Sequence, residues 1–138
     1  MISRKFKAHL VKVGGADCEI ELDVELQYDA EGDPLAVKAI FSEEGSMSPV
    51  EWQFSRKLMM DGAVCGFAIG TGDVKFRYEG ALGGIIACLR SPEGHADIRL
   101  PQPEVVSFLN DTNREVPVGQ EDLGTDLDDE LERIFADE

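Results

Sequence analysis

The chain has 138 residues and carries 13 lysines and arginines against 28 aspartates and glutamates, a formal net charge of −15. This length fits one domain over residues 1–138, which can bury a core without disulfide or metal support. The acidic excess argues against nucleic acid and anionic lipid as partners, because a field of the same sign repels both.

Much of the negative charge lies at the C-terminal end. From Glu115 onward there are ten acids and one base, whereas residues 1–114 hold 18 acids and 12 bases. We therefore divide the domain into a core over residues 1–114 and an acidic linker with a C-terminal amphipathic helix over residues 115–138. The N-terminus shows no signal-peptide pattern, and the longest aliphatic run, residues 85–89, is too short for a transmembrane segment. We expect a soluble, cytoplasmic protein.

Alternation of apolar and polar residues dominates the first part of the chain and predicts two strands. The N-terminal run over residues 5–10 slips at Leu10-Val11, which predicts a bulge. Residues 20–28 then alternate regularly with acids. The segment Gly14-Gly15-Ala16-Asp17 joins the runs as a hairpin turn, so lysines of the first strand should lie near acids of the second.

The next elements complete a plan of four strands and a helix. Residues 35–41 predict a third, mostly buried strand, and residues 50–54 predict a fourth. Ser55 can cap a short helix that runs through Asp61, with Gly62 as its C-terminal stop.

The sequence then repeats this layout. Further strands are predicted over residues 63–69, 73–79, 84–90 and 95–100, the last two joined by a turn at Ser91-Pro92-Glu93-Gly94. Pro101 and Pro103 open a second helix. Four of its residues share one face: Val105, Phe108, Leu109 and Thr112. We expect an α+β fold with two four-stranded antiparallel sheets, each followed by a helix, plus a C-terminal helix.

The C-terminal helix has its own signals. The segment 116–119 is typical of a linker, and Thr125 with Asp128 forms a near capping box. An apolar stripe follows at helical spacing, made of Leu127, Leu131, Ile134 and Phe135. The stripe favours a helix docked on its own domain or on a neighbouring subunit. The alternative is a free helix that binds a partner.

The segment Gly70-Thr71-Gly72 raises the question of a phosphate-binding loop. Such a loop needs the Walker pattern or a dinucleotide fingerprint, and in both cases a helix N-terminus that points at the phosphate. Strand alternation follows here instead, from Asp73 to Glu79. We predict a hairpin turn and no nucleotide cofactor.

The histidines and cysteines give no pattern of a catalytic or metal site. His9 and His95 lack metal-ligand spacing, and Cys18, Cys65 and Cys88 form no CxxC pair. We expect exposed strand histidines and buried, reduced thiols. A nucleophile at Cys65 or Cys88 would need a spatially adjacent base that the sequence cannot show. We predict no catalytic, metal-binding or cofactor-binding residue and no enzymatic activity.

The segment Lys75-Phe76-Arg77-Tyr78 interleaves cations with aromatic residues, as in some nucleic-acid-binding sheets. The competing interpretation is that Phe76 and Tyr78 face the core while Lys75 and Arg77 face water, as the period of two predicts. The acidic charge of the chain favours the second interpretation.

Six segments occur in the order typical of SsgA-like proteins of sporulating actinobacteria, which the chain resembles from about residue 20 to its end. They are Leu26-Gln27-Tyr28-Asp29, Asp33-Pro34-Leu35-Ala36-Val37, Val50-Glu51-Trp52-Gln53-Phe54-Ser55-Arg56, Gly70-Thr71-Gly72-Asp73-Val74, Ser91-Pro92-Glu93-Gly94 and Asp126-Leu127-Asp128-Asp129-Glu130-Leu131. An SsgB-like member of the family fits best. The chain departs from the pattern at the inserted Glu31 and Gly32, at Leu35, at Met59-Met60 and at Phe76-Arg77-Tyr78.

The resemblance implies a non-enzymatic adaptor in sporulation-specific cell division, concentrated at the septum. Family members help to place and assemble the tubulin-like protein FtsZ, so FtsZ and another SsgA-like protein are the expected partners. The resemblance also implies a fold similar to the whirly proteins and homo-oligomers, a trimer among them. Whirly proteins outside the family bind RNA or single-stranded DNA, which makes single-stranded nucleic-acid binding the alternative function. The family implies no catalytic residue, and the partner-binding residues are unknown.

Overall fold

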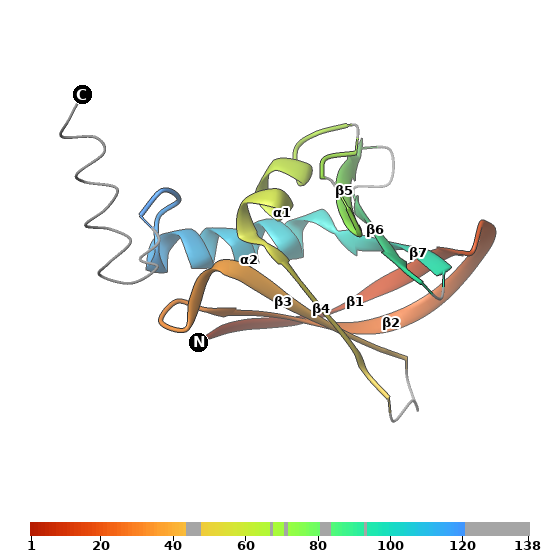
Figure 1. The fold of residues 1–138 in the computed structure, drawn as a ribbon, viewed down its shortest axis with the longest axis horizontal. Coiled ribbons are helices and arrows are strands. Elements are labelled where there is room, and N and C mark those ends of the chain that lie inside the picture. The colour runs from red at the N-terminus through yellow and green to blue at the C-terminus, as the bar shows by residue number, and fades with distance from the viewer. Residues whose placement is uncertain (44–47, 67, 71, 81–83, 93, 121–138) are drawn as a thin grey trace.

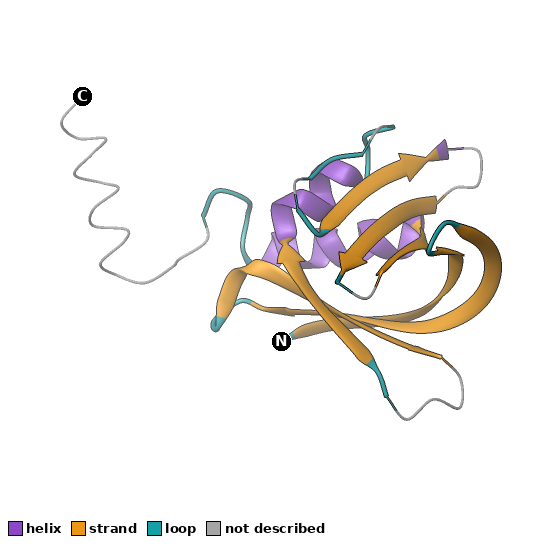
Figure 2. Cartoon of the chain, turned by 45° about the vertical axis from the view of Figure 1, so that its right-hand side comes forward, coloured by secondary structure: helices purple, strands orange, loops and turns teal. Residues whose placement is uncertain are grey.

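The computed structural model describes residues 1–43, 48–66, 68–70, 72–80, 84–92 and 94–120. The strands form one curved antiparallel sheet in the order β4-β3-β2-β1-β7-β6-β5, and both helices lie on its concave side (Figures 1 and 2). The elements are β1 (Ile2–Val13), β2 (Ala16–Asp29), β3 (Asp33–Glu43), β4 (Val50–Ser55), α1 (Arg56–Gly62), β5 (Val74–Glu79), β6 (Gly84–Ser91), β7 (Gly94–Pro101) and α2 (Gln102–Glu115).

The β1–β2 hairpin forms as the sequence predicts. Gly14 and Gly15 have φ angles of 57° and 89°, the left-handed values that a tight two-residue hairpin turn requires. The register shifts between Leu10 and Lys12, which confirms the bulge. Lys12 lies 3.7 Å from the Asp17 carboxylate, so the cross-strand pairing of lysines with acids is also confirmed.

The prediction of two four-stranded sheets is wrong, because β1 joins the two halves of the chain. It is long enough to pair with β2 along its length and with β7 near its C-terminal end, where His9 faces Arg99 and Val13 faces Ala96. Alternation predicts strands but not which strands become neighbours, and this pairing merges the two expected sheets into one of seven strands.

The expected strand over residues 63–69 is absent from the described residues of that segment. The segment instead runs beside β5, where Ile69 forms a single antiparallel bridge with Phe76 and the Cys65 carbonyl accepts a hydrogen bond from the Tyr78 amide at 2.6 Å. The expected third strand is present. Its inner face is buried at Val37, Ala39 and Phe41, residues 36, 38 and 40 of its outer face are half-buried, and Leu35 is 41% exposed. The prediction of a mostly buried strand therefore holds for the inner face and is wrong for Leu35.

The two helices begin where the sequence indicates. The Ser55 hydroxyl accepts a hydrogen bond from the Leu58 amide at 3.3 Å and caps α1. Gly62 ends α1, but not through a left-handed cap, because Ala63 after it remains right-handed. A Cβ on Gly62 would lie 2.3 Å from the Cβ of Phe76, so this position needs glycine for close packing of α1 against β5.

The core lies between the concave face of the sheet and the helices. The buried face of α2 is the predicted one and consists of Val105, Phe108, Leu109 and Thr112. Arg4 on β1 pairs with Glu104 on α2 at 2.7 Å, at the border of this contact. The predicted C-terminal helix lies outside the described residues. Among the described helices, neither is long and apolar enough to cross a membrane.

Candidate interaction surfaces

Gly70 and Gly72 lie between Ile69 and β5, so the strand predicted after the glycine segment is present, whereas the strand expected before it is reduced to one bridge at Ile69. Gly70 and Gly72 have φ angles of 130° and 89°, and the amide and carbonyl groups of Ile69 and Phe76 exchange hydrogen bonds of 2.8 and 3.0 Å across it. Thr71 lies outside the described residues. Because β5 rather than a helix follows, no helix N-terminus is available here for a phosphate.

Cys88 lies opposite an acid, whose effect on the thiol adds to that of burial and outweighs the nearby cations Arg77 and Lys75. Cys88 on β6 faces Asp97 on β7, and burial, together with the charge and hydrogen bonding of Asp97, raises the pKa of the Cys88 thiol. A raised pKa leaves less thiolate at neutral pH, which is the opposite of an activated nucleophile.

The other candidate residues do not converge on one site, although His95 lines the same small depression as Cys88 and Asp97. Cys18, Cys65 and Cys88 are half-buried rather than buried, so the prediction of buried thiols is correct only in part. His9 is half-buried in the middle of the sheet, and His95 is exposed at the start of β7. Within the described part of the chain, no group of three or more His, Cys, Asp and Glu side chains is placed to hold a metal.

The aromatic residues of β5 face inward. Phe76 is buried and contacts the ring of Phe54, with ring centroids 4.9 Å apart. Lys75 and Arg77 are directed to the opposite face, where Arg77 pairs with Glu79 at 3.0 Å. The predicted alternation is confirmed, and β5 presents cations without the exposed aromatic rings that stack on unpaired bases.

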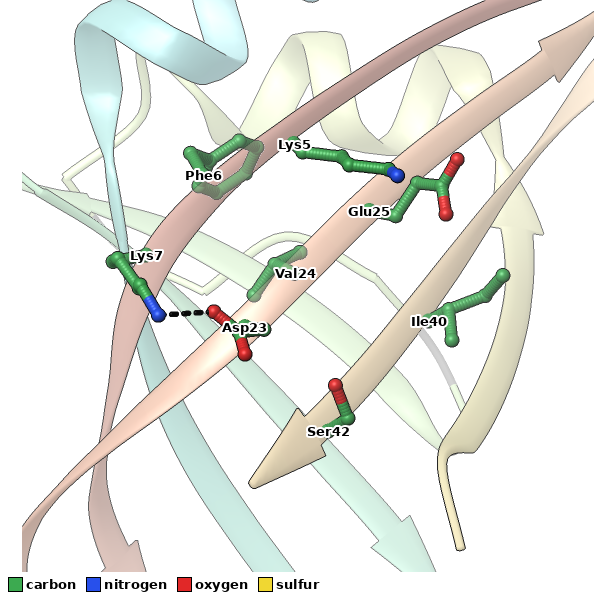
Figure 3. A pocket seen from close by; sticks show the side chains of 8 residues that line it. All are labelled: Lys5, Phe6, Lys7, Asp23, Val24, Glu25, Ile40 and Ser42. Carbon is green, nitrogen blue, oxygen red and sulfur yellow. Dashed lines mark hydrogen bonds and ion pairs between the residues drawn. The ribbon is translucent and has the colours of Figure 1, made fainter. Parts of the chain in front are cut away.

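A depression on the outer face of the sheet contains charges that neutralise one another. It has a volume of about 480 Å³ and is lined by residues of β1, β2 and β3. Figure 3 shows Lys7 bonded to Asp23, with Lys5 and Glu25 beside them and Ile40 on the neighbouring strand. These pairs are half-exposed, and we interpret this surface as a solvated row of cross-strand ion pairs.

An apolar groove of about 400 Å³ is lined by residues of the strands and of the segments beside them. None of its lining residues belongs to α1 or α2. Its floor is the edge of the core, formed by residues such as Phe41 and Ile98. Val13 and Val50 of its lining are 47% and 54% exposed, and Trp52 is half-buried and packs against the core. Exposed apolar groups that continue a core are typical of a protein-binding surface.

Arg56 is the buried charge that sequence reasoning missed. Its side chain is 1% exposed and donates hydrogen bonds to the carbonyls of Thr112 at 3.1 Å and Val116 at 2.7 Å. Its guanidinium also lies 5.0 Å from the ring centre of Tyr28. The cation therefore ties the start of α1 to the C-terminal end of α2, where the helix dipole favours positive charge. No local sequence pattern marks it, because the carbonyls that it binds lie 56 and 60 residues further along the chain.

Comparison with known proteins identifies the family. The family model described as "Streptomyces sporulation and cell division protein, SsgA" matches residues 22–121. This chain belongs to the SsgA family. The sporulation-specific cell division protein SsgB of Streptomyces coelicolor is 37% identical to it over 131 residues, 94% of this chain and 93% of that protein. SsgB of Frankia casuarinae is 38% identical over 132 residues, 94% of this chain and 88% of that protein.

Solved structures of SsgA family members have the same fold. A structure from a study of SsgB mutations that correlate to longitudinal cell division during sporulation of S. coelicolor matches with a TM-score of 0.71 at 33% identity, covering 87% of this chain and 93% of its own. An SsgA-like sporulation-specific cell division protein from Thermobifida fusca matches with a TM-score of 0.73 at 28% identity, covering 96% and 95%.

Proposed function

We propose that this protein is a non-enzymatic adaptor in sporulation-specific cell division and that it promotes the recruitment and assembly of FtsZ at the septum. The observation that supports this proposal is the match to SsgB proteins over 94% of the chain. Residues 1–138 act as one domain in this proposal, with the acidic segment 115–138 as its extension. Another SsgA-like protein is a second partner, and the adaptor works as a homo-oligomer.

The apolar groove is the part of the described surface best suited to a protein partner. Val13 and Val50 expose aliphatic side chains beside core residues, so an apolar partner side chain placed there would bury apolar surface. The outer face offers mainly exposed ion pairs, which contribute little to association.

The test is sedimentation of FtsZ with and without the purified protein. The wild-type chain should increase the pelleted fraction and the filament length. Val13→Asp places a charge at the border of the groove on an interior strand and should reduce the effect. Val64→Asp makes the same change at a 75% exposed position outside the groove and should leave the effect on FtsZ unchanged. If the wild-type protein changes neither pelleting nor filament length, direct action on FtsZ is excluded.

A further inference from the structure

The two edges of the sheet differ in what covers them. At the β5 edge, the preceding segment supplies backbone partners, because the amide and carbonyl groups of Ile69 and Phe76 exchange hydrogen bonds of 2.8 and 3.0 Å. At the other edge, β4 pairs with β3 and with no other described segment. Within the described part of the chain, the outer backbone groups of Val50–Ser55 therefore remain open to a further strand.

The open edge borders the apolar groove. Val50 and Trp52 of β4 line the groove together with Leu89 of β6 and Ala96 of β7. Four strands separate β4 from β6 in the sheet, so the sheet must curl around the groove for both strands to line it. A strand added about 4.8 Å beyond β4 would continue this curl over the groove. One extended segment can therefore occupy the edge and the groove together.

The side chains of β4 define the residues that an added strand should carry. Val50 lies on the concave face and is 54% exposed, so an apolar neighbour would bury its surface. Glu51 and Gln53 lie on the outer face, where Glu51 pairs with Lys38 at 3.0 Å and Gln53 donates to Asp33 at 3.0 Å. Two acids and one base make this side of the edge acidic, which favours basic neighbours.

We propose that the β4 edge binds an extended segment of a partner protein in which apolar residues alternate with lysine or arginine. The segment adds a strand to β4 through backbone hydrogen bonds, with its apolar residues over the groove and its basic residues beside Glu51. The net charge of −15 attracts such a segment and repels an acidic one. The inference rests on the proposed function in taking the groove as the surface that binds a protein partner.

An extended segment fits this surface better than a helix does. A helix in the groove would bury apolar surface but leave the outer backbone groups of β4 without protein partners, whereas a strand satisfies both. The sequence of β4 contains no proline and no lysine, which are common protections of a sheet edge. The strand has six residues, so the contact is small, and we expect weak binding that weakens further as salt is added.

The first experiment uses fluorescence anisotropy to measure binding of the full chain to a labelled, end-capped peptide of alternating valine and lysine. The same peptide with every backbone nitrogen methylated keeps its side chains and charge but cannot donate hydrogen bonds to β4. It should bind at least about tenfold more weakly. A peptide of alternating valine and glutamate should not bind, because its charge has the sign of the chain.

Two variants of the chain test the two sides of β4. Val50→Thr replaces a methyl group with a hydroxyl in the groove and should weaken binding about threefold, whereas Val64→Thr at a 75% exposed position outside the groove should not. Glu51→Gln removes the acid beside the basic residues and should also weaken binding about threefold at low salt. Glu115→Gln is its matched control, because it makes the same charge change at the end of α2.

The second experiment measures amide hydrogen exchange with and without the peptide at one protein concentration. Residues 50–55 should become more protected, and residues 74–79 of β5 should not, because that edge is already covered. Absence of binding, equal affinity for the methylated peptide, or binding without protection of residues 50–55 overturns the proposal. Protection of residues 50–55 that rises with protein concentration in the absence of peptide would assign the edge to a contact between copies and would also overturn it.

These measurements contain no FtsZ, so they separate this inference from the proposed function. A chain that increases FtsZ pelleting but does not bind the valine–lysine peptide overturns the inference alone. A chain that binds the peptide at the β4 edge but leaves FtsZ pelleting and filament length unchanged supports the inference and excludes only direct action on FtsZ.

Discussion

The two helices are stabilised in different ways. The seven-residue α1 follows β4, begins with a side-chain cap from Ser55 and holds the buried cation Arg56, which donates hydrogen bonds to the C-terminal end of α2. The 14-residue α2 follows the interior strand β7, begins at Pro101 without a side-chain cap and packs through the apolar face that includes Phe108. Side-chain hydrogen bonds thus anchor α1, whereas burial of apolar surface holds α2.

The largest loss of stability is expected from a substitution in the buried apolar face of α2. Phe108→Ala removes a side chain that is 0% exposed from the centre of the α2 face and should lower the free energy of unfolding by about 3–5 kcal/mol. Urea denaturation followed by circular dichroism measures the loss. Asn110→Ala on the exposed side of the same helix should change stability by about 0.5 kcal/mol or less. Equal losses in the two variants would contradict the conclusion that α2 is held by burial of its apolar face.

A smaller loss of stability is expected where α1 packs against β5. Gly62→Ala places a Cβ 2.3 Å from the Cβ of Phe76, so α1 must move away from β5 at a cost of about 1–3 kcal/mol. Gly66→Ala is the matched control, because no heavy atom lies within 4 Å of the added Cβ. Denaturation of both variants under the same conditions tests the difference. An equally stable Gly62→Ala variant would show that α1 does not depend on this close approach.

Local patterns predicted much of the fold because the forces behind them act over a few residues. The alternation of residues 20–28, the slip at Leu10-Val11 and the cap at Ser55 each depend on neighbours in sequence, and the structure confirms them. The buried face of α2 was likewise readable from its helical spacing. The role of Gly62 was not, since it depends on Phe76, which is distant in sequence.

The pairing of strands and the interaction surfaces could not be predicted in the same way. Residues 63–69 are apolar enough to suggest a strand, but in the fold the described part of this segment covers an edge through isolated bonds. Val13 and Val50 both line the groove, and both are exposed because of the positions of β1 and β4 in the curved sheet. Asp97 becomes the neighbour of Cys88 only through the register of β6 and β7. These features arise from tertiary contacts, which single-sequence patterns do not encode.

The side-chain cap at the start of α1 is expected to contribute about 1 kcal/mol to the free energy of unfolding. Ser55→Ala removes the acceptor for the Leu58 amide and should lower the free energy of unfolding by about this amount. Ser55→Asp keeps an acceptor at the helix N-terminus and should retain most of the stability. Thermal unfolding of the wild-type chain and the two variants measures the order of their stabilities. If the alanine and aspartate variants lose equally, the hydroxyl does not act as a cap.

The smallest effect concerns the Cys88 thiol on β6, the strand next to the one that leads into α2. Burial is the main cause of its raised pKa, and Asp97 adds to it, so Asp97→Asn should lower the pKa and speed alkylation of Cys88 by iodoacetamide at neutral pH. Mass spectrometry can follow Cys88 and Cys18 in the same sample, and the Cys18 rate should not change. Because the folded chain holds this thiol neutral, the stability it contributes is complete below the pKa of the unfolded thiol and is lost as pH rises through the folded value. An unchanged rate at Cys88 in Asp97→Asn would show that Asp97 does not affect its reactivity, and a slower rate would mean that Asp97 favours the thiolate.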